Sequence, residues 1–259
     1  MSELALRPRS ATELVDAAFQ VYRRAPLQFM VALALVYVPW LVIRLVFGID
    51  LNVAIDAKSI PPTSTIVTLA VVAISTYAIA GGVITAVARD VYLDLPVNVP
   101  EAFRTVATRL VTLIVASVIV VLMLSISFVF FFLPVLYVLS RLAVVRQVIM
   151  LEDAGVGRSL SRSFALSVGL KLHTLGTLAL IGLLILAVNL GADVLFNIIP
   201  SHVVQNVLST ALAVVVGPII GITETVLYYD LRIRREGFDV EYLVGRDATP
   251  PVDPANVAP

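Results

Sequence analysis

Long apolar stretches separated by short polar segments run through most of the chain. A stretch of roughly 17–25 mainly apolar residues is long enough to cross a bilayer as a helix. Six stretches meet this length, at residues 27–48, 65–88, 110–132, 135–151, 172–199 and 203–229. The pattern therefore predicts an all-α fold, a polytopic membrane helix bundle with six transmembrane helices.

The third and fourth predicted spans come from one long, mainly apolar stretch. Residues 110–151 number 42, and one straight helix of that length would measure ~63 Å. This is roughly twice the thickness of the hydrocarbon core. We therefore place a tight turn at Leu133 and Pro134, and a second break at Pro200 and Ser201 between the last two spans.

Each pair of spans is preceded by a short amphipathic segment. The three segments cover residues 10–24, 100–109 and 156–168. In the last of them an apolar residue recurs every fourth position from Val156 to Val168, as on a helix with one apolar face. In the first, Ser10 and Glu13 fit a capping box. We predict three amphipathic surface helices on the cytoplasmic side, and a repeated unit of surface helix, span and span. The alternative is ordinary polar-faced loops.

The basic residues indicate the orientation of the spans. One side of the six-span layout holds 15 of the 18 basic residues. They are Arg7, Arg9, Arg23, Arg24, Arg89, Arg104, Arg109, Arg146, Arg158, Arg162, Lys171, Arg232, Arg234, Arg235 and Arg246. The opposite side holds only Lys58, and Arg44 and Arg141 fall inside spans. By the positive-inside rule, both termini are cytoplasmic.

Composition excludes several classes of protein. Of the 259 residues, 59% are hydrophobic and 14% charged, so the chain is too apolar for a soluble enzyme and for a disordered protein. The net charge is zero, so we expect no nucleic-acid partner. No cysteine and only two histidines are present, so we expect no metal site and no cofactor. We predict one membrane domain over residues 1–247 and a disordered, proline-rich tail over 248–259.

Polar residues inside the spans are candidate functional groups, because burying them in lipid costs free energy. Arg141 and Glu224 both fall in the inner half of the bilayer, so we predict that they pair. The pair is either a structural clamp or part of a permeation or binding route. Arg44 is near the outer end of its span and can extend to the interface. Asn189 and Asp193 form a second polar stripe, one turn apart.

Sequence motifs for catalysis are missing. The chain contains no H-E-x-x-H zinc motif, Walker loop or G-x-S-x-G elbow. Glu152 and Asp153 are explained by ordinary solvated termination of a helix, and we assign no catalytic residue. Glycines at 81–82 and the Gly217–Pro218 pair indicate either close helix packing or broken helices.

Several segments resemble a known bacterial family. The matching residues are Arg7, Pro8, Glu13, Ala17, Phe19, Tyr22, Leu133, Pro134, Arg141, Glu152, the run 159–163 and the closing run 227–239. Together they are similar to the membrane domain of glycerophosphoryl diester phosphodiesterase, over about residues 6–241. The resemblance implies a six-helix protein of the bacterial cytoplasmic membrane without established activity. The family's separate catalytic domain is missing, so phosphodiesterase activity is not implied, and Val135 replaces a usual glycine.

We therefore expect a non-enzymatic membrane protein that scaffolds an assembly or organises lipid. Its expected partners are anionic lipid headgroups, with a membrane-protein partner or a homo-oligomer left open. The candidate headgroup contacts are Arg104, Arg109, Arg158 and Arg162. The alternative is a small transporter or channel with a polar midplane site around Arg141, Glu224 and Asn189. An intramembrane enzyme ranks last, since no nucleophile and base converge.

Overall fold

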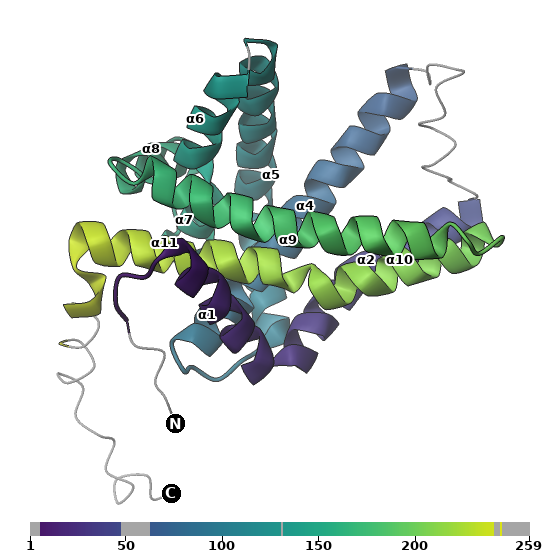
Figure 1. The fold of residues 1–259 in the computed structure, drawn as a ribbon, viewed down its shortest axis with the longest axis horizontal. Helices are drawn as coiled ribbons and strands as arrows, with labels where there is room; N and C mark the ends of the chain where they lie inside the picture. The colour runs from purple at the N-terminus through teal and green to yellow at the C-terminus, as the bar shows by residue number, and fades with distance from the viewer. Residues whose placement is uncertain (1–5, 48–62, 131, 241–243, 245–259) are drawn as a thin grey trace, which may run out of the picture.

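The computed structural model describes residues 6–47, 63–130, 132–240 and 244, which form helices joined by short turns (Figure 1). The helices are α1 (Ala11–Arg24), α2 (Pro26–Phe47), α4 (Thr63–Tyr92), α5 (Val99–Val129), α6 (Phe132–Leu142), α7 (Val145–Glu152), α8 (Val156–Leu166), α9 (Lys171–Phe196), α10 (His202–Val216) and α11 (Pro218–Glu236). Lys58 and the predicted tail at 248–259 lie outside the described residues.

Six helical stretches are long and apolar enough to cross a membrane, which confirms the predicted number. They are Pro26–Val46, Ile66–Tyr92, Val99–Val129, Pro134–Glu152, Lys171–Phe196 and His202–Glu236. The first, second and fifth are each formed by a single helix, α2, α4 and α9. The chain is therefore a helical protein with six segments able to span a bilayer, as the hydrophobic pattern predicts.

The second predicted surface helix is not a separate element, so this prediction is corrected. Asn98 caps α5, and Pro100 stands in its first turn. Nothing between Arg109 and Leu110 interrupts the backbone hydrogen bonds, so the segment 100–109 continues into the third span as one helix of 31 residues. At ~1.5 Å per residue, α5 is ~46 Å long and exceeds the hydrocarbon thickness.

The first and third amphipathic segments do form helices of their own, α1 and α8. The predicted capping box is present in α1, where the Glu13 amide donates to Ser10 Oγ at 3.3 Å and the Ser10 amide donates to Glu13 Oε2 at 2.8 Å. Both helices place their inner faces on protein. Leu14 and Ala18 of α1 are fully buried, against α9 and α11, and Ser163 of α8 is fully buried as well.

Two of the spans are broken. The fourth consists of α6 and α7, separated at Ala143 and Val144, and the sixth consists of α10 and α11, separated at Gly217. Pro218 is the first residue of α11, a position where its missing N–H costs little. A Cβ at Gly217 would collide with the carbonyl oxygen of Ala213. Glycine followed by proline thus ends one helix and starts the next.

The protein core lies toward the ends of the spans where most arginines are found. It is built from α1, α7, α11 and the second half of α4, with Ile84, Ile149 and Tyr228 among its largest fully buried side chains. The other ends of α2, α5 and α9 carry exposed apolar residues such as Val46 and Val129. This distribution is expected where lipid covers a helix, since a bilayer solvates apolar side chains.

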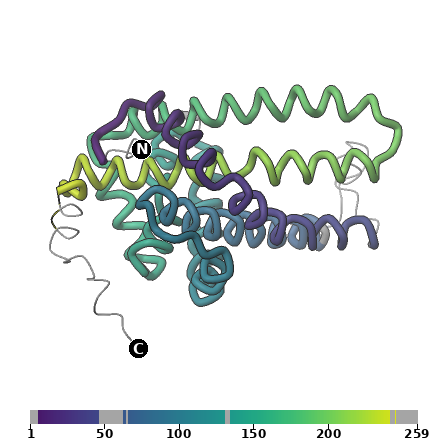
Figure 2. The backbone as a smooth tube through the Cα atoms, turned by 90° about the horizontal axis from the view of Figure 1, so that it is seen from below, coloured from purple at the N-terminus to yellow at the C-terminus, as the bar shows by residue number. Residues whose placement is uncertain are grey.

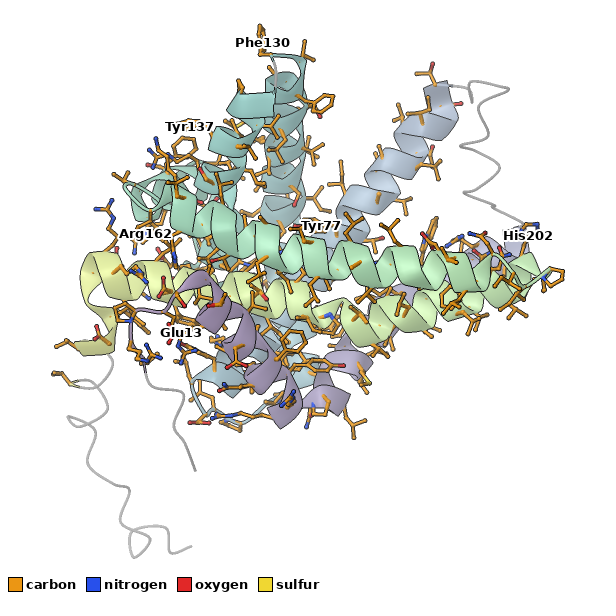
Figure 3. The ribbon with its side chains drawn as sticks, viewed as in Figure 1. Glu13, Tyr77, Phe130, Tyr137, Arg162 and His202 are labelled. Carbon is orange, nitrogen blue, oxygen red and sulfur yellow. The ribbon has the colours of Figure 1, made fainter. Side chains whose placement is uncertain are left out.

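The helices diverge away from this core. Figure 1 shows α5 and α6 rising together, α4 running off diagonally, and α9 with α10 crossing the view as a hairpin. Turned by 90°, α10 lies between α9 and α2 (Figure 2). Phe130 and His202 mark two widely separated hairpin tips, whereas Arg162 and Glu13 lie near the core (Figure 3).

Candidate functional site

An ion pair between Arg146 and Glu224 lies where the two broken spans meet. Arg146 stands in the first turn of α7, and Glu224 lies in α11, six residues beyond Pro218. Arg146 Nη2 pairs with Glu224 Oε2, and the same oxygen accepts a 3.2 Å hydrogen bond from Gln147 Nε2. The two charged side chains are only 11% and 10% exposed. Both helix breaks therefore place charged groups in the interior.

The guanidinium of Arg146 packs closely against α4. It lies 4.6 Å from the centroid of the Tyr77 ring, and its Nη1 donates to the Tyr77 carbonyl oxygen at 3.5 Å. A Cβ at Gly81 would collide with the guanidinium. Of the two readings of residues 81–82, close packing is therefore correct for Gly81, where a glycine is needed to admit the arginine.

The predicted pair of Arg141 and Glu224 is wrong, because the partner of Glu224 is Arg146. Arg141 instead donates to the Phe164 carbonyl oxygen at 3.0 Å and to Ser167 Oγ at 3.4 Å. Its guanidinium also lies 5.4 Å from the centroid of the Tyr137 ring. Arg141 lies at the end of α6 and Arg146 at the start of α7, on either side of the turn at 143–144, and the two side chains contact different neighbours.

Sequence reasoning missed Arg146 as a site residue. It was counted among the cytoplasmic charges at the end of the fourth span, although Val145 and Val148 beside it are buried. The signal was available, because Arg146 and Gln147 interrupt an otherwise apolar run from Leu142 to Leu151. Two adjacent polar residues within a span are expensive in lipid and point to a partner inside the protein.

Two cavities flank Arg146. The large cavity, of about 390 Å³, is lined by fourteen residues from α4 to α7, all apolar except Tyr77, Ser117 and Arg146. The small cavity, of about 110 Å³, is lined by residues of α2, α4 and α11 and by Gly217 at the helix break. Tyr77 and Arg146 line both cavities. Arg146 of the ion pair therefore borders two cavities that are partly open to the outside.

The pair is chemically suited to hold or to recognise a polar group. Breaking a buried pair by removing one partner typically costs ~3–5 kcal/mol, since the remaining charge is left uncompensated. Two atoms of the cluster, Arg146 Nε and Gln147 Oε1, are buried without a hydrogen-bond partner. The site thus combines a compensated charge with unused hydrogen-bonding capacity, next to a cavity with apolar walls.

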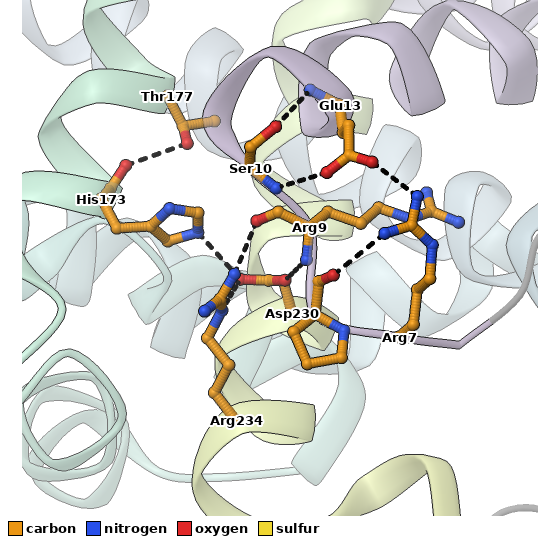
Figure 4. A network of polar contacts seen from close by, with 9 residues as sticks. Arg7, Arg9, Ser10, Glu13, His173, Thr177, Asp230 and Arg234 are labelled. Carbon is orange, nitrogen blue, oxygen red and sulfur yellow. Dashed lines mark hydrogen bonds and ion pairs between the residues drawn. The ribbon is translucent and has the colours of Figure 1, made fainter.

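A second polar cluster joins the N-terminal segment to α9 and α11. The carboxylate of Asp230 accepts from the Arg9 amide at 2.7 Å, from Arg234 Nε at 2.8 Å, and lies 2.8 Å from His173 Nε2 (Figure 4). Arg234 Nη2 donates in turn to the Arg9 carbonyl oxygen at 2.7 Å. The cluster therefore ties the N-terminal segment to α9 and to the last part of α11.

A third cluster links α7, α8 and α11. Arg162 Nε donates to both oxygens of Glu152, at 3.0 and 2.9 Å, and Nη2 donates to Glu236 Oε2 at 2.8 Å. The hydrogen bond to Glu236 contributes most to raising the pKa of Arg162, and the hydrogen bond to Glu152 raises it further. The Tyr228 hydroxyl also donates to Glu152, at 2.9 Å. Glu152, predicted to be a solvated helix end, is therefore part of a protein network.

The four predicted headgroup arginines divide into two groups. Arg162 is held in the cluster above, and Arg109 donates to the carbonyl oxygens of Ile149 and Met150. Arg104 is 79% exposed, and Arg158 is exposed on α8. Of the four, Arg104 and Arg158 are thus the two exposed ones, and Arg104 lies 3.8 Å from Glu101 Oε2 in an exposed ion pair.

The remaining polar residues of the spans lie apart from the ion pair. Arg44 donates to Asn206 Oδ1 at 2.6 Å, a contact between α2 and α10. Asn189 donates to the carbonyl oxygen of Ile185 on its own helix and is exposed, and it lines neither cavity. The structure therefore does not bring Asn189 together with Arg141 and Glu224.

Within the described ranges, no group of three or more metal-ligating side chains comes together. Comparison of the chain with protein-family models, with curated proteins and with solved structures finds no match. The function proposed below therefore rests on the geometry of the chain itself.

Proposed function

We propose that this chain is a non-enzymatic membrane protein that organises lipid by holding an amphipathic molecule in its large cavity. The observation that carries the proposal is this cavity, about 390 Å³ in volume and apolar apart from Tyr77, Ser117 and Arg146. Ligand sites of ~300–1,000 Å³ with apolar walls and a few polar groups are typical of small-molecule binding. An amphiphile matches this lining, with its acyl chain on the apolar residues and its polar head toward Arg146.

The position of the cavity supports access from the bilayer. Its lining comes from α4 on one side and from α5, α6 and α7 on the other. Helices α5 and α6 rise together from the core and α4 runs off diagonally, whereas α7 belongs to the core itself (Figure 1). A lipid-like molecule could therefore enter sideways from the membrane, without crossing water.

The test is the lipid that co-purifies with the full chain in mild detergent, counted by mass spectrometry. We expect Ala73→Phe, which places a ring at the cavity wall, to reduce the bound lipid several-fold. Ala179→Phe is the matched control, since Ala179 is also an exposed alanine of a membrane helix but lines neither cavity. Equal lipid content in the two variants would contradict the proposal, as would a stoichiometric protein partner with no bound lipid, which would favour scaffolding.

We further propose that the chain is a stand-alone member of the glycerophosphoryl diester phosphodiesterase membrane-domain family. The proposal is supported by the residue resemblance and by six helices long enough to span a bilayer. It includes a bacterial cytoplasmic membrane location with both termini inside, which is supported by the asymmetry of the basic residues.

A small transporter is the second candidate function. The observation that favours it is that Arg146 lines both cavities and stands beside two helix breaks. Broken helices that meet at a polar site are common at transporter binding sites. Flux of the co-purified molecule into sealed liposomes would support this candidate, and binding without flux would exclude it.

A further inference from the structure

The charge state of the large cavity restricts what its occupant can be. Arg146, the charged residue in its lining, is compensated by Glu224 directly behind it. A carboxylate or phosphate placed on Arg146 would add a second negative charge to a buried site that already holds one. A cationic head would face the guanidinium itself. Either charge is costly in a medium of low dielectric constant.

The site nevertheless has hydrogen-bonding capacity to spare. The Ser117 hydroxyl lines the cavity and makes no hydrogen bond to any residue that the structure describes. Tyr77 contributes a second hydroxyl-bearing side chain to the same lining. In a membrane interior such groups gain from a hydrogen-bonding partner, since no bulk water satisfies them.

These observations select one ligand class, and the inference rests on the function proposed above. We propose that the large cavity binds an uncharged amphiphile, with one acyl chain and a hydroxyl- or ester-bearing head of the monoacylglycerol type. The acyl chain of the ligand lies along the apolar wall formed by α4 and α5. The head reaches Ser117, Tyr77 and Arg146 while the ion pair with Glu224 stays intact.

The experiment is a competition assay on the purified full chain in detergent, with radiolabelled monododecanoylglycerol as the probe. The competitors are the unlabelled probe, dodecanoate and dodecylamine, which carry the same chain length and differ in the charge of the head. We expect both charged competitors to bind about tenfold or more weakly than the unlabelled probe, since each brings an uncompensated charge into the site.

The Glu224→Gln variant gives the Arg146 site a net positive charge and provides a second test. With the carboxylate replaced by an amide of similar size, Arg146 is left uncompensated and becomes a site for an anion. We expect dodecanoate to become the strongest competitor, a change of about tenfold or more relative to the probe. Glu101→Gln is the matched control, because Glu101 is exposed at the start of α5 and lines only a separate surface pocket.

The outcomes separate this inference from the proposed function. If the probe and both competitors bind the native chain no more tightly than they bind the Ala73→Phe variant, the lipid-holding function itself fails. If dodecanoate or dodecylamine competes with the native chain as well as the unlabelled probe does, the inference fails and the proposed function stands. The same follows if Glu224→Gln folds and leaves the order of competitors unchanged. If the Glu224→Gln variant does not fold, the order in which the competitors bind the native chain still tests the inference.

Discussion

At the scale of single residues, the partner of Glu224 decides how the interior is organised. An ionised carboxylate at 10% exposure requires compensation, and Arg146 and Gln147 supply it from α7. Arg141, only five positions earlier, donates through Nη1 to acceptors on α8 and in the turn that follows it. Two arginines in one span thus have different roles, set by the turn between them.

The pair predicts strong coupling in a double-mutant cycle. We expect Arg146→Gln and Glu224→Gln each to lower the free energy of unfolding by about 3–5 kcal/mol, since each leaves a buried charge unpaired. The double variant should lose clearly less than the sum of the two. Denaturant titration in detergent measures these values. Arg141→Gln is the control, and its effect should add to that of Glu224→Gln, whereas coupling of Glu224 to Arg141 would contradict the assignment.

Gly81 provides a second test at this scale. An alanine methyl there would displace the Arg146 guanidinium, and overpacking of this kind costs about 1–3 kcal/mol. The control is Gly182→Ala on α9, where a Cβ meets nothing within 4 Å. We expect the first substitution to lower the thermal midpoint of the detergent-solubilised chain and the second to leave it unchanged or raise it slightly. Equal midpoints for the two variants would contradict the packing of Arg146 on Gly81.

At the scale of elements, α1 shows how a local signal and a tertiary contact act together. Ser10 and Glu13 define where the helix begins, by a capping box that could be predicted from four residues of sequence. The buried face of α1 includes Leu14 and Ala18. Helices α9 and α11 cover it, so the helix is tied to the bundle rather than lying on lipid with that face.

The capping box predicts a specific response to pH. Hydrogen bonds from the Ser10 amide, Arg7 and the Ser10 side chain lower the pKa of Glu13 to about 2, from an ordinary value of 4.5. A lowered pKa means that the contribution to stability is complete above about pH 4.5 and is lost as pH falls toward 2. Carboxyl NMR shifts of Glu13 should follow this midpoint.

The Ser10→Ala variant is the matching control for that titration. It removes the hydroxyl that caps the helix and leaves the amide and Arg7 in place, so the Glu13 midpoint should rise only part of the way toward 4.5. Loss of the cap should also cost about 0.5–2 kcal/mol of stability. A Glu13 midpoint near 4.5 in the native chain would refute the capping geometry.

At the scale of the whole molecule, the structure has a protein core at one end and diverging helices at the other. The core carries the clusters around Asp230 and Arg162 as well as the Arg146–Glu224 pair, whereas the outer ends of α5 and α9 carry exposed apolar residues such as Val129 and Leu195. Such a molecule depends on the bilayer to cover its outer half, because that half has little protein to pack against.

The proposed orientation can be tested directly, since the native chain contains no cysteine. We expect His202→Cys, at the tip of the α9–α10 hairpin, to react with a membrane-impermeant maleimide added to intact cells. Gly157→Cys, exposed on α8, should react only after the cells are opened. Labelling of Gly157→Cys in intact cells would overturn the assignment of α8 to the cytoplasm.

The amino-acid sequence by itself determined the number of spans, the class of fold and the capped start of α1. These features depend on hydrophobic length, which the bilayer thickness imposes, and on contacts within a few residues. The segment 100–109 continues into α5 without a break, since a change from amphipathic to apolar composition need not interrupt a helix. The predicted number of spans does not depend on this difference.

Only the tertiary structure decided which residues meet. The breaks at 143–144 and at Gly217 divide two spans into shorter helices, and the packing of these helices on their neighbours sets which residues face one another. No periodicity count along a straight helix can predict this, so Arg141 was chosen over Arg146. The cavity beside Arg146 likewise depends on how α4, α5, α6 and α7 are placed around it. Contacts between distant segments follow from packing geometry, which local patterns do not contain.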